Sequence, residues 1–462
     1  MPIYAVPKDN GTTYRMVTNH SAGPFSLNSM IDKAHVSPSP LDNMTHVGDR
    51  LIRFREAKPD SHLTMWKADV AEAYRLLPVH PHWQLKQVVT LNGVRHVNRH
   101  NTFGGRASGA IWIAFMALVT WIAQNVRLVE NLIGAYVDDS FGFDEIDDVA
   151  FYCPYSKFLP RSQALLLELW DELGIPHKER KQVFGSPLTI IGFDVDPNNM
   201  SITLPDAAKK ELLNEIETWI MKPKKGSNNK GKFKIARWQS FTGWFNWALN
   251  VYPWLRPTLN RIYPKMSGKE NPSMKVWINN AIRHDLTWAL NHLRNLPGTH
   301  IMSNTSWDLS KADVTIYVDA CLEGMGFWYA NQSVGYYSPV PTSTPSCHIF
   351  YFEALCALSA LIHATSHNPS ASRIVIFSDS TNTVDMFSSL RVDQTFNHLL
   401  LMASDIVLKN DVDLRVLHIA GKDNVIADAI SRLQISSVLN LIPDFYLQYF
   451  QPPRFLLGVV HN

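Results

Sequence analysis

The sequence is poor in cysteine and carries almost no net charge. It has four cysteines in 462 residues and no C-x-x-C pair, which argues against a disulfide scaffold or a zinc finger and favours a reducing compartment. Lysine and arginine total 43 against 41 aspartates and glutamates. This balance excludes a strongly basic packaging protein and an acidic tail protein, but not an enzyme with a local basic groove. The first residues lack a signal-peptide pattern, so we expect an intracellular protein, in cytoplasm or nucleus, that is not secreted.

Hydrophobic residues are abundant, at 46%, which is enough for packed cores and excludes a disordered chain. At roughly 150 residues per domain, the length suggests about three domains. One apolar run, residues 107–126, has the length of a membrane span and no charge. Polar residues interrupt this run, and Arg106 and Arg127 bracket it. We therefore favour a helix buried in a large domain and no membrane partner, and a membrane span remains the alternative.

The first part of the chain alternates strand and helix patterns. Residues 63–70 predict a strand, and residues 133–143 predict two short strands around an acidic turn. Residues 162–174 have helical spacing, and residues 188–196 and 200–204 predict the two strands of a hairpin. These elements predict a mixed sheet with helices.

The rest of the chain divides near residue 206 and again near residue 307. From 206 the pattern is helical and includes a basic stretch, 221–238, and several tryptophans, which at helical spacing we expect in the core. Part of the basic stretch could equally be a flexible loop. From 307 we expect three strands in a meander, a helix over 348–364, and then alternating strands and helices, which is typical of a mixed α/β domain.

Two adjacent carboxylates, Asp138 and Asp139, lie between apolar stretches, and Asp69 ends a separate predicted strand. Neighbouring carboxylates repel one another, and their burial without a partner is costly, so such a turn favours a cation. Carboxylates together with substrate phosphates suit Mg²⁺, and a pair of such ions activates a hydroxyl and stabilises a leaving group. A solvated acidic turn is the alternative, because aspartate is common in turns.

The surroundings of this turn resemble the motifs of reverse transcriptases. Tyr-Val-Asp-Asp (136–139) is similar to the family's central turn. Other motifs stand in the family's order: the fingers hairpin (6–31), the first carboxylate motif (68–81), the motif that opens the helix beneath the nucleotide (102–112) and the two that close the palm (173–185 and 188–196). The resemblance implies a right-hand polymerase fold and assigns Asp69, Asp138 and Asp139 as ligands of two Mg²⁺ ions, with Mn²⁺ as a possible substitute.

The same resemblance implies roles for residues that contact the nucleotide. Tyr74 matches the aromatic steric gate, whose ring would collide with a ribose 2′-hydroxyl and so favour deoxynucleotides. Lys181 matches a lysine that would protonate pyrophosphate. The remaining expected nucleotide-binding residues are Lys8 and Arg15, which would neutralise the triphosphate, and Phe103 and Gly104, which would line the pocket. Each basic residue taken alone is better explained as an exposed surface charge, and only its position in the motifs favours the nucleotide-binding role.

A second acidic group spans the last part of the chain. Asp319 and Asp379 end predicted strands, Glu353 is the only charge in the apolar helix 349–362, and Asp428 lies in a short terminal helix. Each has an ordinary structural interpretation as a turn, salt bridge or cap. Together their order resembles the ribonuclease H family over residues 310–434, which implies that the four carboxylates hold two Mg²⁺ ions. His418 would assist proton transfer or product release.

The whole chain resembles the reverse transcriptase–ribonuclease H segment of a retrotransposon polyprotein, of tyrosine-recombinase or pararetrovirus type. The expected α+β architecture comprises partial fingers and palm (1–205), a helical thumb or connection (206–305), a ribonuclease H-like domain (306–435) and a C-terminal tail (436–462). The expected activities are RNA- and DNA-directed DNA polymerase and cleavage of RNA in RNA/DNA hybrids. Template-primer, hybrids and dNTPs are the partners. Because the chain opens inside the fingers region, an inactive relic that still binds nucleic acid is the alternative.

Overall fold

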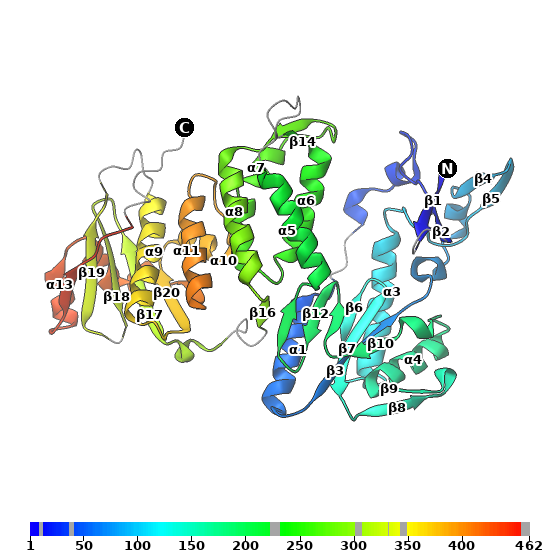
Figure 1. Ribbon diagram of the computed structural model, residues 1–462, viewed down its shortest axis with the longest axis horizontal. Coiled ribbons are helices and arrows are strands. Elements are labelled where there is room, and N and C mark those ends of the chain that lie inside the picture. Colours follow the sequence, from blue (N-terminus) through cyan, green and yellow to red (C-terminus); the bar gives the residue numbers. More distant parts are fainter. Residues whose placement is uncertain are drawn as a thin grey trace. The chain divides into compact units, whose positions relative to one another are not determined.

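The computed structural model describes residues 1–8, 13–36, 41–221, 232–300, 307–330, 332–341 and 349–453 (Figure 1). The chain forms two compact units. One comprises Met1–Pro205 and His300, and the other comprises Asp206–Thr299 and the described residues from Trp307 onwards. Both units mix helices and strands.

The first unit is built on a four-stranded sheet with the order β10-β3-β7-β6. Its strands are Val183–Gly185 (β10), Leu63–Asp69 (β3), Asp139–Glu145 (β7) and Leu132–Tyr136 (β6). The strand predicted at 63–70 and the two predicted around the acidic turn are confirmed. All neighbours in this sheet are antiparallel. Helix α4 (Arg161–Leu173) is also where the sequence predicts a helix, and it ends at Gly174, whose φ of +68° suits glycine.

Helix α3 (Ser108–Asn125) corresponds to the apolar run. Its buried face presents Trp112, Met116 and Val119 to a core that also contains Trp66 and Trp170. The opposite face is exposed, so the expectation of a buried helix holds for one face only. The exposed apolar side chains of α3 include Ile111, Leu118 and Trp121.

Within the described parts of the chain, two helices, α3 and α9 (Ile349–His367), are long and apolar enough to cross a membrane by length and composition alone. In α9, 61% of the apolar segment is buried inside the protein, whereas in α3 only 28% of the apolar segment is buried. The burial of α9 is that of a core helix.

Smaller hairpins complete the first unit. They are β1–β2 (Ile3–Lys8, Thr13–Thr18), β4–β5 (Val88–Leu91, Val94–Val97) and β8–β9 (Val149–Tyr152, Lys157–Pro160). The hairpins β1–β2 and β4–β5 are not hydrogen-bonded to the four-stranded sheet. Helix α1 (Met44–Ala57) precedes β3 in the chain. The predicted hairpin at 188–204 is present, but its first strand is broken into β11 (Leu188–Ile190) and β12 (Phe193–Asp196) before β13 (Ser201–Thr203). The break is at Ile191 and Gly192, which both have positive φ.

Asp144 joins the sheet to helix α4. It lies on β7, is fully buried, and accepts hydrogen bonds from the Ser162 backbone N–H at 3.0 Å and the Ser162 hydroxyl at 2.6 Å. The Asn131 amide donates a third at 3.1 Å. Since Pro160 at the helix start provides no side-chain cap, Asp144 caps α4 from a neighbouring strand.

We expect the stability of this unit to fall as pH rises towards 6. Burial, the largest cause, raises the pKa of Asp144 to about 6, while the hydrogen bonds from Ser162 and Asn131 oppose the rise. Between about pH 4 and 6 the folded state therefore keeps a proton that the unfolded state has released, and each rise in pH favours unfolding. The Asp144→Asn variant removes this titration. Its free energy of unfolding in urea should vary less between pH 4.5 and 7 than that of the wild type, by on the order of 2 kcal/mol. Equal variation in the two proteins would contradict this assignment.

The second unit begins with a group of helices. They are α5 (Asp206–Ile220), α6 (Ile235–Ala248), η6 (Pro253–Leu259), α7 (Ile262–Met266) and α8 (Asn280–Asn295). Strands β14 (Lys232–Lys234) and β15 (Lys275–Trp277) form a small antiparallel pair. Trp219 and Trp238 are fully buried and pack edge to face, as the predicted core role of the tryptophans requires, whereas Trp244, Trp247 and Trp254 are only partly buried. Of the basic stretch, Lys222, Lys224, Lys225 and Lys230 lie outside the described residues.

A six-stranded sheet follows, with the order β21-β20-β17-β18-β19-β22. Its strands are Val314–Ala320 (β17), Gly324–Tyr329 (β18), Val334–Pro339 (β19), Arg373–Ser378 (β20), Asp413–His418 (β21) and Tyr446–Tyr449 (β22). The meander and the later strands are confirmed. Part of the predicted tail joins this domain, because β22 pairs in parallel with β19 and helix α13 (Ile435–Leu441) packs nearby through Val438.

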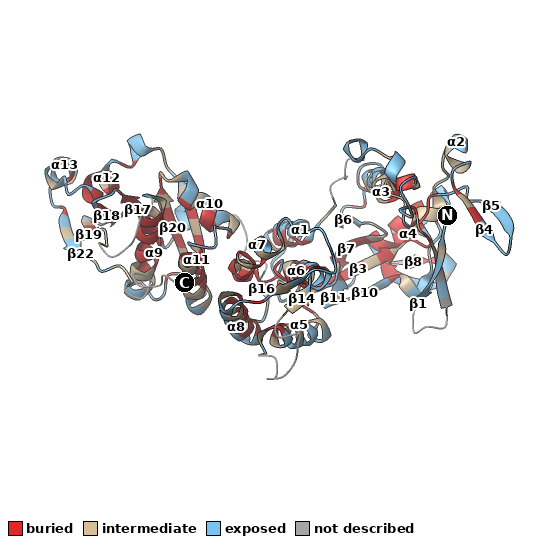
Figure 2. Ribbon diagram, turned by 90° about the horizontal axis from the view of Figure 1, so that it is seen from above, coloured by how far each residue is buried: buried red, intermediate tan, exposed pale blue. Residues whose placement is uncertain are grey.

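Helices cover both faces of this sheet. Helix α9 packs on the face that carries Val314, Ile316 and Val318, and its buried residues are visible in Figure 2. Helix α12 (Val425–Ser431) lies on the other face, where Gly326 leaves room for it: a Cβ there would lie 2.7 Å from the Ser431 nitrogen. Helices α10 (Thr381–Ser389) and α11 (Asn397–Asn410) complete the unit.

A buried polar network joins the helical part of this unit to α11. The fully buried Asp285 of α8 accepts from Arg261 at 2.6 Å and from the Asn397 amide at 3.3 Å. Asn260 in turn donates to Asn397 at 2.8 Å. Because a buried carboxylate needs such partners, the network specifies how these helices meet.

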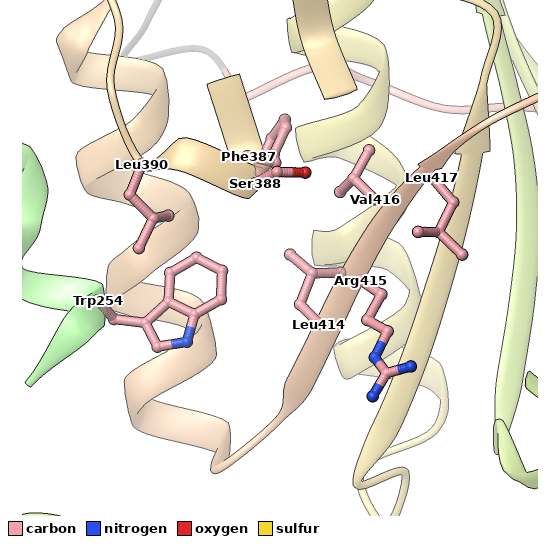
Figure 3. Close-up of a pocket in the computed structure, with 8 residues that line it drawn as sticks. All are labelled: Trp254, Phe387, Ser388, Leu390, Leu414, Arg415, Val416 and Leu417. Carbon is pink, nitrogen blue, oxygen red and sulfur yellow. The ribbon is translucent and has the colours of Figure 1, made fainter. Parts of the chain in front are cut away.

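A pocket of about 250 Å³ lies beside this junction (Figure 3). Trp254 of η6 lies on one side, near Leu390, and Leu414 and Arg415 of β21 lie across from it. The Arg415 guanidinium is already engaged, since it donates to the Trp307 carbonyl at 2.8 Å and lies over its ring. The pocket is therefore mainly a packing gap between apolar side chains.

Candidate active sites

Strand pairing brings the first three predicted carboxylates together. Asp69 ends β3 and lies directly opposite Asp139, the first residue of β7. The Val70 N–H donates to the Asp138 carbonyl at 3.1 Å, which extends this pairing by one residue. Asp138 is in the two-residue turn between β6 and β7, because Tyr136 pairs with Asp139. Residues far apart in the sequence thus meet at one end of the sheet.

Two lysines form ion pairs with two of these carboxylates. The Lys181 Nζ lies 2.5 Å from the Asp69 Oδ1, and the Lys67 Nζ lies 3.6 Å from the Asp139 Oδ2. Burial raises the pKa of Asp139, Lys67 lowers it, and the charges of Asp138 and Asp69 raise it further. The charges of Asp69 and Asp138 are therefore close enough to act on Asp139.

The predicted steric gate lies beside the carboxylates. Tyr74 is in the 3₁₀ turn Ala73–Leu76, just after Asp69, and its pKa is raised by burial and by the charge of Asp138. Its ring contacts Phe103, at 5.2 Å between centroids, and Trp112, at 6.3 Å. Gly104 has a φ of +104°, and a Cβ there would lie 2.6 Å from the Thr18 carbonyl oxygen, so only glycine suits this position.

The two predicted triphosphate-binding residues lie on the first hairpin. Lys8 ends β1, and Arg15 on β2 pairs with Val6. The side chains of Lys8 and Arg15 lie outside the described part of the chain. For these two residues the structure gives the backbone position alone.

The second acidic group gathers where β17 and β20 end. These strands are parallel, with Val318 opposite Ser378, so Asp319 and Asp379 lie at the same end of the sheet. Glu353 comes from the first turns of α9 and Asp428 from α12. His418 ends β21, pairs with Ser378, and is exposed.

The carboxylates of this group influence one another. Burial raises the pKa of Glu353 to about 7, and the charges of Asp319 and Asp379 add to the rise. Burial also raises the pKa of Asp319 to about 6, with contributions from Asp379 and Asp428 and opposition from a Ser431 hydrogen bond. Such shifts indicate a cluster of negative charge that a cation would stabilise.

Neighbouring residues orient this cluster. The Ser431 hydroxyl donates to Asp319 at 2.5 Å, and Arg432 donates to Asp428 at 2.8 Å. The Asn424 amide donates to the Val318 carbonyl at 3.0 Å, which fixes the start of α12 beside Asp319. A Cβ on Gly421 would lie 3.1 Å from an Asp379 oxygen, so this loop passes close to the cluster.

Within the residues that the structure describes, no group of three or more His, Cys, Asp or Glu side chains is arranged so that it could hold a metal ion. At the first group, lysine ammonium groups contact two of the carboxylates, Asp139 and Asp69. At the second, the buried Oε2 of Glu353 has no hydrogen-bond partner among the described residues. A buried carboxylate oxygen without a partner is costly, and carboxylate oxygens are the donor type that a hard cation such as Mg²⁺ prefers.

Several contributing residues were not predicted from the sequence. Lys67 could have been found from strand periodicity, since it is two residues before Asp69 and so lies on the same face. Ser431 lies three residues after Asp428, on the same side of α12. Gln182 gives no such signal, although its side chain accepts from the Asp69 N–H at 3.2 Å and donates to the Asp69 carbonyl at 3.1 Å. Its contacts depend on the pairing of β10 with β3.

Comparison with known proteins finds structural likeness without a sequence match. No protein family and no curated protein matches the sequence. The chain is similar in structure to foamy viral protease–reverse transcriptases, in a complex of the dRH form with double-stranded DNA, one with an RNA/DNA hybrid and another with double-stranded DNA. The TM-score is 0.47 for each, with identities of 15%, 15% and 14%. The matches cover 90%, 90% and 97% of this chain, but only 65%, 50% and 77% of theirs.

Proposed function

We propose that the chain is a DNA polymerase that copies RNA or DNA templates and also cleaves RNA in RNA/DNA hybrids, as an intracellular retroelement enzyme does. The observation that carries the proposal is the register of β3 and β7, which sets Asp69 against Asp139 beside the turn of Asp138, with the Tyr74 ring nearby. The second carboxylate group, at the ends of β17 and β20, supports the cleavage activity.

At the first group, Asp69, Asp138 and Asp139 would hold two Mg²⁺ ions and Tyr74 would contact the sugar of the incoming dNTP. Lys181, which is in contact with Asp69, would donate a proton to the departing pyrophosphate. Lys8, Arg15, Phe103 and Gly104 are proposed to bind the nucleotide. When bound, the ions supply charge neutralisation and a more acidic hydroxyl or water at each site.

At the second group, Asp319, Glu353, Asp379 and Asp428 would hold the ions around an RNA phosphodiester. Ser431 and Arg432 orient Asp319 and Asp428. His418, which is exposed, would assist proton transfer or product release. The two groups act on different bonds and can be tested separately.

Primer extension tests the proposal directly. The purified protein, with oligo(dT) on poly(rA), dTTP and Mg²⁺, should extend the primer and should also degrade the RNA of a hybrid. Binding of the hybrid by folded protein without either reaction would contradict the enzymatic proposal and select the alternative of an inactive relic. Chelation of the metal should abolish both reactions and leave the fold intact.

Tyr74→Val should weaken discrimination against ribonucleotides. Without the ring, a 2′-hydroxyl no longer meets an obstacle, and the ratio of kcat/KM for dTTP over UTP should fall on the order of tenfold to a hundredfold. Tyr74→Phe is the matched control, because it keeps the ring and should keep the ratio. Equal ratios for Tyr74→Val and wild type would refute the gate.

A further inference from the structure

The turn that carries Asp138 is strained at the residue before it. Val137 has a φ of +58°, which a β-branched residue rarely adopts. Such a conformation persists only when its surroundings hold it in place. Because Val137 immediately precedes Asp138, its backbone conformation sets the direction in which the turn presents that carboxylate.

The contact that holds Val137 comes from helix α3. The Trp112 indole N–H donates to the Val137 carbonyl at 2.7 Å, and the Trp112 side chain is fully buried. The same ring lies edge-on to Tyr74 and packs against Phe115, 5.5 Å away. Trp112 thus contacts both the turn of Asp138 and the aromatic ring proposed to contact the sugar.

We propose that Trp112 is a positioning residue of the polymerase site: its N–H holds Val137 in the left-handed conformation, while its ring supports Tyr74. The inference rests on the proposed polymerase function. It assigns to one side chain the alignment of the metal-binding turn with the nucleotide pocket. A phenylalanine would fill most of the same space and lose the hydrogen bond.

The test compares Trp112→Phe with a matched control, Trp170→Phe. Trp170 is also fully buried in the same core, and its indole nitrogen has no hydrogen-bond partner among the described residues. The first readout needs no catalysis. Hydrogen exchange measured by mass spectrometry over residues 132–145 should be about tenfold faster in Trp112→Phe than in wild type. It should be little changed in Trp170→Phe.

The second readout is the dependence of primer extension on metal. In Trp112→Phe, kcat should fall on the order of tenfold to a hundredfold, as expected for a misplaced catalytic group. The Mg²⁺ concentration for half-maximal extension should rise several-fold. Cleavage of hybrid RNA by the same protein should be unchanged.

A second substitution separates positioning from packing. Glycine adopts positive φ without strain, so Trp112→Phe/Val137→Gly should recover most of the lost rate and hairpin protection, and should restore folding if the single variant does not fold. Failure of this rescue, or equal effects of Trp112→Phe and Trp170→Phe on exchange and Mg²⁺ dependence, would overturn the inference. If wild type extends no primer, the polymerase proposal fails, and the exchange comparison still decides whether Trp112 holds the turn.

Discussion

Asp138→Asn should reduce primer extension roughly a thousandfold while hybrid-RNA cleavage stays at the wild-type level. Asparagine keeps the size of the side chain but removes the negative charge needed to hold Mg²⁺. The loss of one such ligand removes several kcal/mol of transition-state stabilisation. Asp138 also follows the strained Val137 in the turn that the pairing of Tyr136 with Asp139 closes.

The control for this change is Asp147→Asn, the same substitution at an exposed position in the same unit. It should leave both activities unchanged. Single-turnover rates of extension and cleavage, measured on one preparation of each variant, make the comparison independent of yield. Loss of hybrid cleavage in folded Asp138→Asn would contradict the assignment of two separate sites.

Asp379→Asn should have the reverse effect, with hybrid cleavage reduced roughly a thousandfold and primer extension retained. Asp379 follows β20, and its charge contributes to the raised pKa of both Asp319 and Glu353. Removal of that charge should lower the pKa of Glu353 as well as remove a proposed metal ligand. The pH profile of any residual cleavage should therefore shift towards lower pH.

Asp385→Asn is the matched control, because Asp385 is exposed on the neighbouring helix α10. It should retain cleavage. A gel assay with a 5′-labelled RNA strand in a hybrid measures the cleavage rate. Primer extension on poly(rA) measures the activity of the proposed polymerase site. Normal cleavage by Asp379→Asn would exclude this cluster as the hydrolytic site.

Much of the fold could be predicted from local patterns. The burial of alternate residues in β17, the apolar helix α9 and the glycine that ends α4 all follow from side-chain periodicity and backbone preference. The break in the predicted strand at 188–196 could not be predicted, since it depends on a positive φ at Ile191, a residue type that favours strands. The exposed face of α3 could not be predicted either, because an apolar composition does not show which side of a helix packs against other elements.

The sequence by itself determined which carboxylates are available and on which elements they lie, because each follows a recognisable strand or helix pattern. Only the tertiary structure decided what those carboxylates contact. Lys67 reaches Asp139 and Trp112 reaches Val137 through the pairing of β3 with β7 and the packing of α3, and Ser431 reaches Asp319 because a glycine lets α12 approach the sheet. Such contacts depend on strand register and on close packing between distant segments, and neither is encoded in any local stretch of residues.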